Sequence, residues 1–406
     1  MEFRFTKEQE EWRREVRDFF TREAPPELVR RLMLEKKCTN PLSLDLYMKM
    51  SEKGWFKKTW PQDYGGEGKS RWHDTILTEE MGYCVIPRGT WNLYANTVQF
   101  LGNSLIAGGT EEQKRRWLPL IANGEFRTSN GITEPNAGSD VSIIETTALE
   151  ETTAVEKDDY FVVNGAKIFN QAHNAEYITA IVRTDPSLPK RRGMSVLLIN
   201  LKSPGVAVDP SLVAISGWLR SEVFFQDVHV PKANLLGEKN GGWDYLIGEY
   251  LPIERTSVAA ADLGELFRIL EELVEYSKET RCDGHLLIQV PQIRSMLADM
   301  WTELLASRLL IYHTIWKLGK GEDVRQDANM AKLYFSEVND RFCNAAMEIV
   351  GRYGQLEILN PYTRWLALGG KVAYLYNHSR IDQIGGGASE ILRDQIAVRK
   401  LGLSRA

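Results

Sequence analysis

The sequence predicts a multidomain α+β protein in which a helical region, an antiparallel β region and a second helical region follow one another. Three observations predict this order: apolar residues at helical spacing near the start, short β-branched runs in the middle, and long amphipathic stretches at the end. We expect an N-terminal helical domain over residues 1–125, an antiparallel β-barrel domain over 126–237 and a C-terminal four-helix bundle over 238–406.

The first region has apolar residues at helical spacing from Glu8 to Glu23 and again from Leu42 to Lys53. The pattern returns from Asp74 to Ala122, with breaks near Pro87 and at Gly108. These stretches predict a set of amphipathic helices with loops between them.

The middle region carries a turn signal, Asn164-Gly165, between two apolar runs. This pair suits a type I′ turn and predicts a β-hairpin, because both central residues of that turn need positive φ. Further strands are expected over Tyr177–Thr184 and Met194–Asn200. Short strands separated by turns favour an antiparallel sheet or barrel over a βαβ array.

The last region predicts long helices over Ala259–Val274, Ile293–Trp316, Ala328–Gly351 and Arg364–Ser379. Each carries an apolar stripe, and successive amphipathic helices are typical of a bundle.

Composition excludes several classes of protein. The 406 residues carry a net charge of -5, whereas nucleic-acid binders normally carry a basic excess. No apolar run reaches the ~18 residues of a membrane span and no signal segment opens the chain, so we expect a cytoplasmic protein. Four scattered cysteines and six dispersed histidines indicate neither a disulfide framework nor a metal site.

Three polar or glycine-rich segments are candidate sites, and each has a structural alternative. Thr133–Asp140 is either a surface turn or a cofactor-binding segment rich in hydrogen-bond donors. In Glu254-Arg255, the glutamate is either an acid that complements the dipole at a helix N-terminus or a catalytic carboxylate. Gly385–Gly387 either leads to a helix cap at Ser389 or lets backbone approach a ligand. No complete GxGxxG or GxxxxGK[ST] occurs, so a dinucleotide would need another architecture.

The motifs together resemble the acyl-CoA dehydrogenase family over essentially the whole chain. Each motif alone is weak, but their order and spacing are specific. They are Trp60-Pro61, Tyr64-Gly65-Gly66, Gly109 to Gln113, Thr133 to Asp140, Asn164 to Lys167, Phe225 to Val228, Val230-Pro231, Gly237-Glu238, Glu254-Arg255-Thr256, Gln292-Ile293-Arg294 and Ser389-Glu390-Ile391.

The resemblance implies a flavoprotein oxidoreductase that uses FAD. Such an enzyme removes the α-proton of an acyl-CoA thioester, passes the β-hydrogen as hydride to FAD, and forms a 2-enoyl-CoA. It further implies electron-transfer flavoprotein as the electron acceptor and a homotetramer built as a dimer of dimers.

The family pattern also implies cofactor-binding residues. Those lining the flavin and pyrophosphate are Asn130, Ile132, Thr133, Ser139, Phe169 and Gln171. Those matching contacts to the adenosine of a neighbouring subunit's cofactor are Arg281, Glu348, Ala388 and Glu390, and Gln292 matches a further cofactor-binding position. Phe169 and Gln171 replace the usual aromatic and hydroxyl pair, which leaves the contact to flavin N5 open at Gln171. Glu348 stands where glutamine is usual, and Gly284 where phenylalanine is.

The catalytic base shows the main departure. Many members carry it as a glutamate in the loop before the last helix, where this chain has Gly386. Another branch, including isovaleryl-CoA dehydrogenase, carries it on a bundle helix before an arginine, where this chain has Glu254. The resemblance therefore implies Glu254 as the base, while the backbone N–H of Gly386 keeps its role at the thioester oxygen.

The glycine loop enlarges the pocket, which in the family accompanies bulky, branched or aryl-substituted acyl groups. Among these, benzylsuccinyl-CoA is the specific candidate we favour. Substrate contacts are expected at Ser139, Arg255, Arg88 and Trp91. Two alternatives stay open: a subunit that lends its surface to the FAD site of a heteromeric dehydrogenase, and a flavin oxidase or monooxygenase on the same scaffold.

Overall fold

The computed structural model describes residues 4–25, 27–29, 41–143, 153–157, 160–214, 216–217, 219–356 and 367–404. Its residues form two compact units, each of which is described separately. The bundle unit comprises Met1–Lys36, Lys69–Pro87 and Glu254–Ala406, and the sheet unit comprises Lys37–Gly68 and Arg88–Ile253. The predicted domain boundaries at residues 125 and 237 stay predictions.

The helices follow the predicted stretches closely. They are α1 (Lys7–Glu23), α3 (Pro41–Glu52), α4 (Trp72–Tyr83), α5 (Arg88–Tyr94), α6 (Asn103–Gly108), α7 (Glu111–Ala122), α8 (Gly242–Tyr245), α9 (Leu251–Glu279), α10 (Pro291–Leu318), α11 (Arg325–Val350), α12 (Lys371–Asp382) and α13 (Ser389–Arg399). Two π-helical stretches, Ala95–Gly102 and Leu246–Tyr250, lie between these helices.

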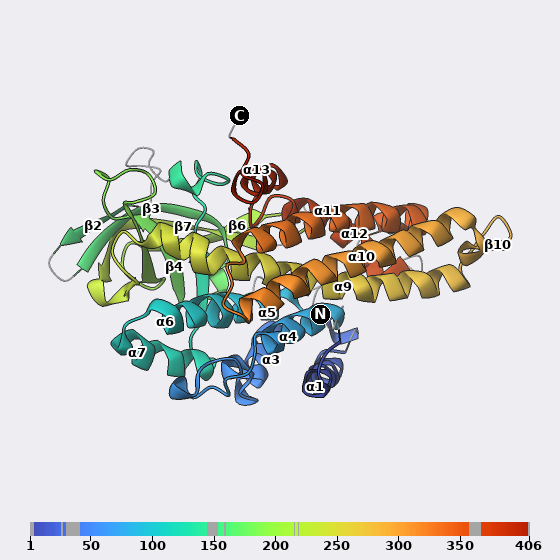
Figure 1. Ribbon diagram of the computed structural model, residues 1–406, viewed down its shortest axis with the longest axis horizontal. Coiled ribbons are helices and arrows are strands. Elements are labelled where there is room, and N and C mark those ends of the chain that lie inside the picture. Colours follow the sequence, from blue (N-terminus) through green and yellow to red (C-terminus); the bar gives the residue numbers. More distant parts are fainter. Residues whose placement is uncertain are drawn as a thin grey trace. The chain divides into compact units, whose positions relative to one another are not determined.

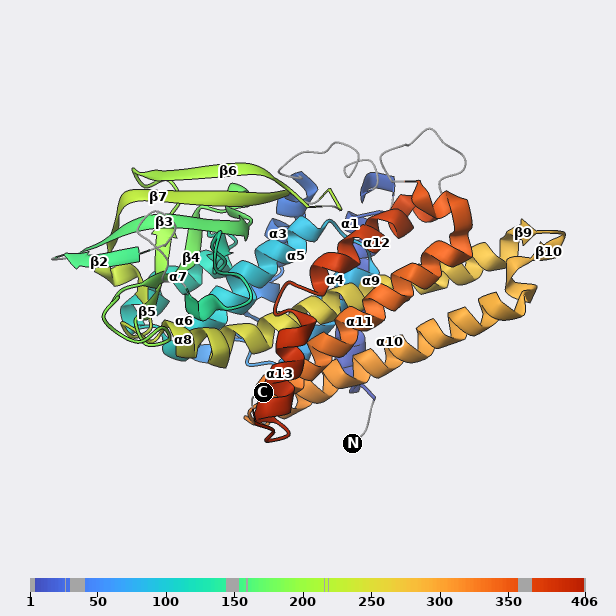
Figure 2. The same ribbon diagram turned by 90° about the horizontal axis from the view of Figure 1, so that it is seen from above.

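The bundle unit is built around α9, α10, α11 and α12, which lie side by side in both views (Figures 1 and 2). Their apolar stripes face inward and form one core, which confirms the predicted helical bundle. Buried members of this core include Leu263, Leu266, Ile269, Leu304, Ile311, Phe335, Val338, Phe342, Val372 and Leu375. The last bundle helix was predicted to begin at Arg364, which lies outside the described residues; α12 begins only at Lys371, because Leu368 and Gly369 have positive φ of +49° and +64°.

Helices α1 and α4 complete the bundle unit through a buried carboxylate. Glu79 on α4 accepts hydrogen bonds from Arg13 on α1 (3.1 Å) and from Arg308 on α10 (2.5 Å). The hydroxyl of Tyr312, also on α10, donates to the other Glu79 oxygen at 2.8 Å. The first helix of the chain is thus joined to residues about 300 positions later.

The sheet unit contains strands β1 to β8. They are β1 (Thr128–Gly131), β2 (Thr153–Lys157), β3 (Tyr160–Asn170), β4 (Tyr177–Arg183), β5 (Met194–Asn200), β6 (Val206–Val213), β7 (Leu219–Pro231) and β8 (Leu235–Leu236). The order is β6-β7-β3-β2-β4-β5-β8, with β1 beside β4 (Figure 2). Most neighbours are antiparallel, as predicted, while β1 and β2 pair with β4 in parallel.

The predicted hairpin at Asn164-Gly165 is wrong, because β3 continues straight through both residues. The ladder with β7 changes register there, since Val163 pairs with Val228 and Gly165 with Phe225. The amide of Asn164 accepts from the backbone N–H of Asp227 at 2.8 Å and donates to its carboxylate at 3.2 Å. The turn-forming pair thus marks a β-bulge, a feature that also uses unusual backbone angles.

A short β9–β10 hairpin (Arg281–Cys282, His285–Leu286) joins α9 to α10 in the bundle unit. Within the described residues, no helix is both long and apolar enough to cross a bilayer.

Candidate functional site

Glu254 and Gly386 face the same space, although 132 positions separate them in the chain. Glu254 lies half-buried in the first turn of α9, and Gly386 lies in the turn between α12 and α13. A Cβ atom placed on Gly386 would lie 3.9 Å from Glu254 Oε2. A longer side chain at 386 would therefore extend from a point beside the Glu254 carboxylate.

The backbone at Gly386 favours glycine. Its φ is +70°, a left-handed conformation that costs most other residues about 1–2 kcal/mol. Gly387 follows with φ of +115°. This geometry explains glycine at both positions without any role for a side chain.

Two buried cations hold the carbonyls of these glycines. Arg255 Nε on α9 donates to the Gly386 oxygen at 2.8 Å, and Lys332 Nζ on α11 donates to the Gly387 oxygen at 2.7 Å. The Gly386 N–H, in contrast, donates to no acceptor in the described part of the chain. The loop thus keeps one backbone donor for a ligand beside Glu254.

A hydrogen-bond network with Asn329 fixes the side chain of Arg255. Its Nη1 donates to Asn329 Oδ1, whose amide nitrogen in turn donates to Gln326 and Gln395 at 3.1 Å each. Burial lowers the pKa of Arg255 to about 10, an effect that neighbouring Glu254 opposes. Arg255 therefore stays charged at neutral pH.

Lys332 and Asn329 are functional candidates that sequence reasoning missed. Lys332 occupies the buried face of α11 between Ala328 and Phe335, and only 5% of it is exposed. The sequence offered one signal for Lys332: a lysine at a position where the helical spacing predicts a buried apolar residue.

A second group of predicted residues meets in the sheet unit. The segment after β1 lies along the end of β3, because Ile168 N–H donates to the Thr133 oxygen at 2.9 Å. Gln171 N–H donates to Ser129 Oγ, also at 2.9 Å. The Asn130 amide donates to Asn96 at 2.7 Å. Thr133 and Gln171 are thus fixed at the end of the same strand.

Phe169 stands out within this group. Its side chain is 61% exposed and its φ is +59°, a left-handed conformation that is unusual for an aromatic residue. Strain of this kind persists where the surrounding structure imposes it and often marks a ligand site. An exposed ring beside polar Gln171 suits a flat aromatic ligand with a polar edge.

A buried ion pair anchors this region. Lys167 Nζ on β3 lies 2.7 Å from Glu134 Oε1 and 3.3 Å from the Ile132 oxygen, and both charged side chains are almost fully buried. Burial lowers the pKa of Lys167, while Glu134 opposes that shift. The pair fixes residues 132–134 against β3.

The remaining predicted residues of the bundle unit lie at both ends of its helices. Arg281 is the first residue of β9 and Gln292 lies at the start of α10, so both are at the opposite end of α9 from Glu254. Figure 1 shows the β9–β10 hairpin at that end of α9. Glu348 is exposed on α11. Ala388 and Glu390 directly follow the glycine loop, at the start of α13.

Three predicted contacts lie in the sheet unit outside the Phe169 group. Ser139 is exposed in the loop after β1. Arg88 is half-buried at the start of α5. Trp91 is buried on the same helix, and its indole N–H has no acceptor among the described residues.

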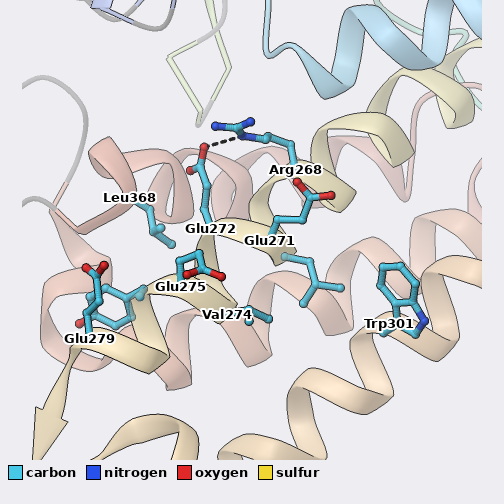
Figure 3. Close-up of a pocket in the computed structure, with 10 residues that line it drawn as sticks. Arg268, Glu271, Glu272, Val274, Glu275, Glu279, Trp301 and Leu368 are labelled. Carbon is cyan, nitrogen blue, oxygen red and sulfur yellow. Dashed lines mark hydrogen bonds and ion pairs between the residues drawn. The ribbon is translucent and has the colours of Figure 1, made fainter. Parts of the chain in front are cut away.

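A groove of about 710 Å³ on α9 and α10 is a different place from the Glu254 site. It is lined by Glu271, Glu275, Trp301 and the Arg268–Glu272 pair, in which Nε lies 2.9 Å from the carboxylate (Figure 3). Arg268 follows Glu254 by 14 residues, which is about 21 Å along a helix. We therefore do not assign the groove to the chemistry at Glu254.

Comparison with known proteins covers nearly the whole chain. Three family models match: acyl-CoA dehydrogenase N-terminal domain over residues 6–125, middle domain over 129–228 and C-terminal domain over 240–401. Acyl-CoA dehydrogenase FadE26 of Mycobacterium tuberculosis is 31% identical over 422 residues, covering 100% of both chains. Caffeyl-CoA reductase-Etf complex subunit CarC of Acetobacterium woodii is 30% identical, covering 95% of this chain and 96% of its own.

Among solved structures, the Tcur3481-Tcur3483 steroid ACAD matches with a TM-score of 0.89 and 30% identity, covering 100% of both chains. Sequence and fold therefore agree along the full length. The chain belongs to the acyl-CoA dehydrogenase family, whose members are FAD-dependent oxidoreductases.

Proposed function

We propose that this acyl-CoA dehydrogenase removes the α-proton of its thioester substrate with Glu254. One observation carries the proposal: a Cβ on Gly386 would lie 3.9 Å from Glu254 Oε2. A carboxylate supplied from α9 can therefore act where a loop glutamate at position 386 would act. Gly386 itself supplies no carboxylate.

The chemistry needs more than a base, because the α-proton of a free thioester is too weakly acidic for a glutamate. Hydrogen bonds to the thioester oxygen stabilise the charge that develops there. The Gly386 N–H, which has no acceptor among the described residues, is the donor that we assign to this oxygen. A bound acyl group that excludes water from Glu254 makes its carboxylate a stronger base.

The sheet unit offers residues that fit FAD. The exposed ring of Phe169 and the polar groups of Asn130 and Gln171 suit a flat ring system with a polar edge. Hydroxyl groups at Thr133 and Ser139 suit the pyrophosphate. When bound, FAD accepts the hydride from the β-carbon. We assign these residues, with Ile132, to holding the cofactor.

Substitution of Glu254 by glutamine tests the base. The Glu254→Gln side chain keeps its size but cannot take a proton at neutral pH, so flavin bleaching by substrate should slow ~100-fold or more. Glu275→Gln, on the exposed face of the same helix, is the matched control and should bleach normally. Near wild-type bleaching in Glu254→Gln, with FAD content unchanged, would sink the assignment.

For the substrate, we propose a bulky, branched or aryl-substituted acyl group, with benzylsuccinyl-CoA as one candidate. Gly386 has no side chain beside Glu254, which supports this class. So do two relatives, one named a steroid ACAD and the other a subunit of a caffeyl-CoA reductase complex. We expect Arg255 to contribute at the thioester end and assign Arg88 and Trp91 to the acyl end.

Gly386→Asn tests this proposal, because asparagine tolerates a left-handed backbone better than leucine does. The added side chain should slow bleaching by branched or aryl thioesters about 10-fold more than bleaching by butyryl-CoA. Equal losses on both classes would show that glycine at position 386 is needed only for its backbone conformation.

We further propose a homotetramer that passes electrons to electron-transfer flavoprotein, a partner class named for the caffeyl-CoA relative. Arg281, Gln292, Glu348, Ala388 and Glu390 are proposed to contact FAD near or across a subunit boundary. The distance of Arg281 from Glu254 along α9 supports a role toward another copy.

The two-protein name of the steroid enzyme favours a second candidate, a subunit of a heteromeric dehydrogenase. Light scattering and flavin stoichiometry on the purified chain separate the two. A mass near four chains with one FAD per chain supports the homotetramer, whereas a flavin-free chain that gains FAD only with a partner supports the heteromer.

A further inference from the structure

Lys332 is buried beside the glycine loop without a carboxylate at hydrogen-bond distance. Its Nζ donates to the Gly387 oxygen at 2.7 Å, and that oxygen is the one acceptor it has among the described residues. Its Cε lies 3.8 Å from a Cβ placed on Gly386, so the side chain passes directly under the loop. Burial of this cation outweighs the attraction of the more distant carboxylates of Asp382, Glu254 and Glu337, so its position is unfavourable for stability and points to another role.

The loop itself needs external support. Three consecutive glycines have no side chains to pack, and glycine loses more conformational freedom on ordering than any other residue. The backbone bonds of the segment run from Gly385 N–H to Ile381 and from Gly387 N–H to Ile384. They leave the carbonyls of Gly386 and Gly387 to Arg255 and Lys332, which bind them from two different helices.

Holding two successive carbonyls fixes the planes of the peptide groups around Gly386. The N–H of Gly386 belongs to the peptide group just before these two carbonyls. Its direction is therefore tied to theirs through the φ and ψ angles of Gly386. Arg255 alone fixes one plane. The second cation removes the remaining rotation at Gly387, where φ is +115°.

We propose that Lys332 is a positioning residue that clamps the Gly387 carbonyl and thereby aims the Gly386 N–H at the thioester oxygen. This inference adds to the proposed function and depends on it for the role of the N–H. The clamp replaces the side-chain packing that a longer residue at position 386 would supply. It acts through the backbone and touches neither the substrate nor the α-proton.

The first test measures the loop without any substrate. In Lys332→Met, amide hydrogen–deuterium exchange in the peptide 384–388 should become about 10-fold faster, the general range for losing a charge-assisted hydrogen bond. Lys371→Met removes another lysine of the same unit, one that pairs with Glu272, and should leave this peptide unchanged. Unchanged exchange in Lys332→Met overturns the clamp.

The second test separates positioning from general destabilisation. Methionine has a similar length and is apolar, so Lys332→Met should keep its FAD content and melt no lower than wild type. Its maximal rate of flavin bleaching should fall about 10- to 100-fold while KM changes less than about 3-fold, because the lost interaction forms in the transition state. Lys332→Arg keeps a cation and should recover part of the rate.

The two tests fail independently. Normal bleaching in Glu254→Gln would overturn the proposed base but leave the exchange result on Lys332 standing. Faster exchange with an unchanged bleaching rate would overturn the aiming role of Lys332 while leaving Glu254 as the base.

Discussion

Two buried lysines support the two candidate regions, and they do so in different ways. Lys167 in the sheet unit binds the Glu134 carboxylate at 2.7 Å and a carbonyl at 3.3 Å. Among the described residues, Lys332 in the bundle unit donates only to a carbonyl. The first lysine is half of a buried ion pair, whereas the second has carboxylates only beyond hydrogen-bond distance, at Asp382, Glu254 and Glu337.

The difference teaches that burial of a charge does not by itself reveal its role. Removing one member of a compensated pair leaves the other charge stranded in the interior, while removing a lone cation removes a desolvation penalty. The same substitution should therefore act in opposite directions at Lys167 and Lys332.

The largest expected effect is at Lys167. Lys167→Met leaves the Glu134 carboxylate buried without its partner and should lower the free energy of unfolding by about 3–5 kcal/mol. Urea unfolding of the purified protein measures this loss, and the double variant Lys167→Met/Glu134→Leu should recover most of it. A loss below about 1 kcal/mol in the single variant would contradict the role given to the ion pair.

The pH dependence of stability should sharpen the contrast at Lys332. Burial lowers the pKa of Lys332 to about 8, and the positive charge of Arg255 adds to this lowering. The carboxylates of Asp382, Glu254 and Glu337 oppose it. Between pH 8 and the ordinary lysine pKa of 10.5, the unfolded chain holds a proton that the folded chain has released, so stability rises with pH.

The desolvation penalty of the Lys332 ammonium is thus fully present below pH 8. Its destabilising effect relative to the unfolded chain disappears toward pH 10.5, where the unfolded lysine also loses its proton. Lys332→Met lacks it and should be more stable than wild type at pH 7 by on the order of 2–3 kcal/mol, with the advantage vanishing at high pH. Thermal unfolding of both proteins across pH 7 to 10.5 measures the difference. A constant difference across that range would contradict the assigned titration.

The smallest expected effect compares one glycine from each region. Gly387 has φ of +115°, and a Cβ there would lie 3.1 Å from Leu392 Cδ2, so Gly387→Ala should cost about 1–3 kcal/mol. Gly138 has ordinary backbone angles and nothing within 4 Å of an added Cβ, so Gly138→Ala should stay within about 0.5 kcal/mol of wild type. Equal effects would show that the glycine loop is no more constrained than the loop around Gly138.

The sequence predicted the elements whose periodicity is long. α9, α10 and α11 were expected because their apolar residues repeat over several turns, which a short strand cannot offer. The hairpin at Asn164-Gly165 failed because positive φ suits a bulge as well as a turn. The partner that decides between them, Asp227, lies 63 residues away.

The candidate site shows a similar division. The family pattern pointed to Glu254 and Gly386 separately, and the structure adds that both face one space. The apolar stripe of α11 could have pointed to a buried lysine at position 332, but its partner, a backbone carbonyl 55 residues later, leaves no pattern in the chain. The exposure of Phe169 was equally invisible, since it depends on a left-handed angle within a strand.

The assembly of the bundle unit from three chain segments has a consequence during synthesis. Trp12, Val16, Phe19 and Phe20 on α1 are buried in the finished protein. Yet Arg13 of this helix also donates a hydrogen bond to the Tyr312 hydroxyl, and Tyr312 is synthesised 299 residues later.

At ~5–20 residues per second, a ribosome needs roughly 15–60 s to reach Tyr312. During that time α1 can already pack its apolar residues against α4, as Trp12 does against His73, while the contact of Arg13 with Tyr312 on α10 is still missing. The full sheet unit ends at Ile253 and can complete its own contacts before the bundle unit does. The order of synthesis therefore lets the sheet unit be completed first, and the contact between Arg13 of the first helix and Tyr312 is among the last that the bundle unit can form.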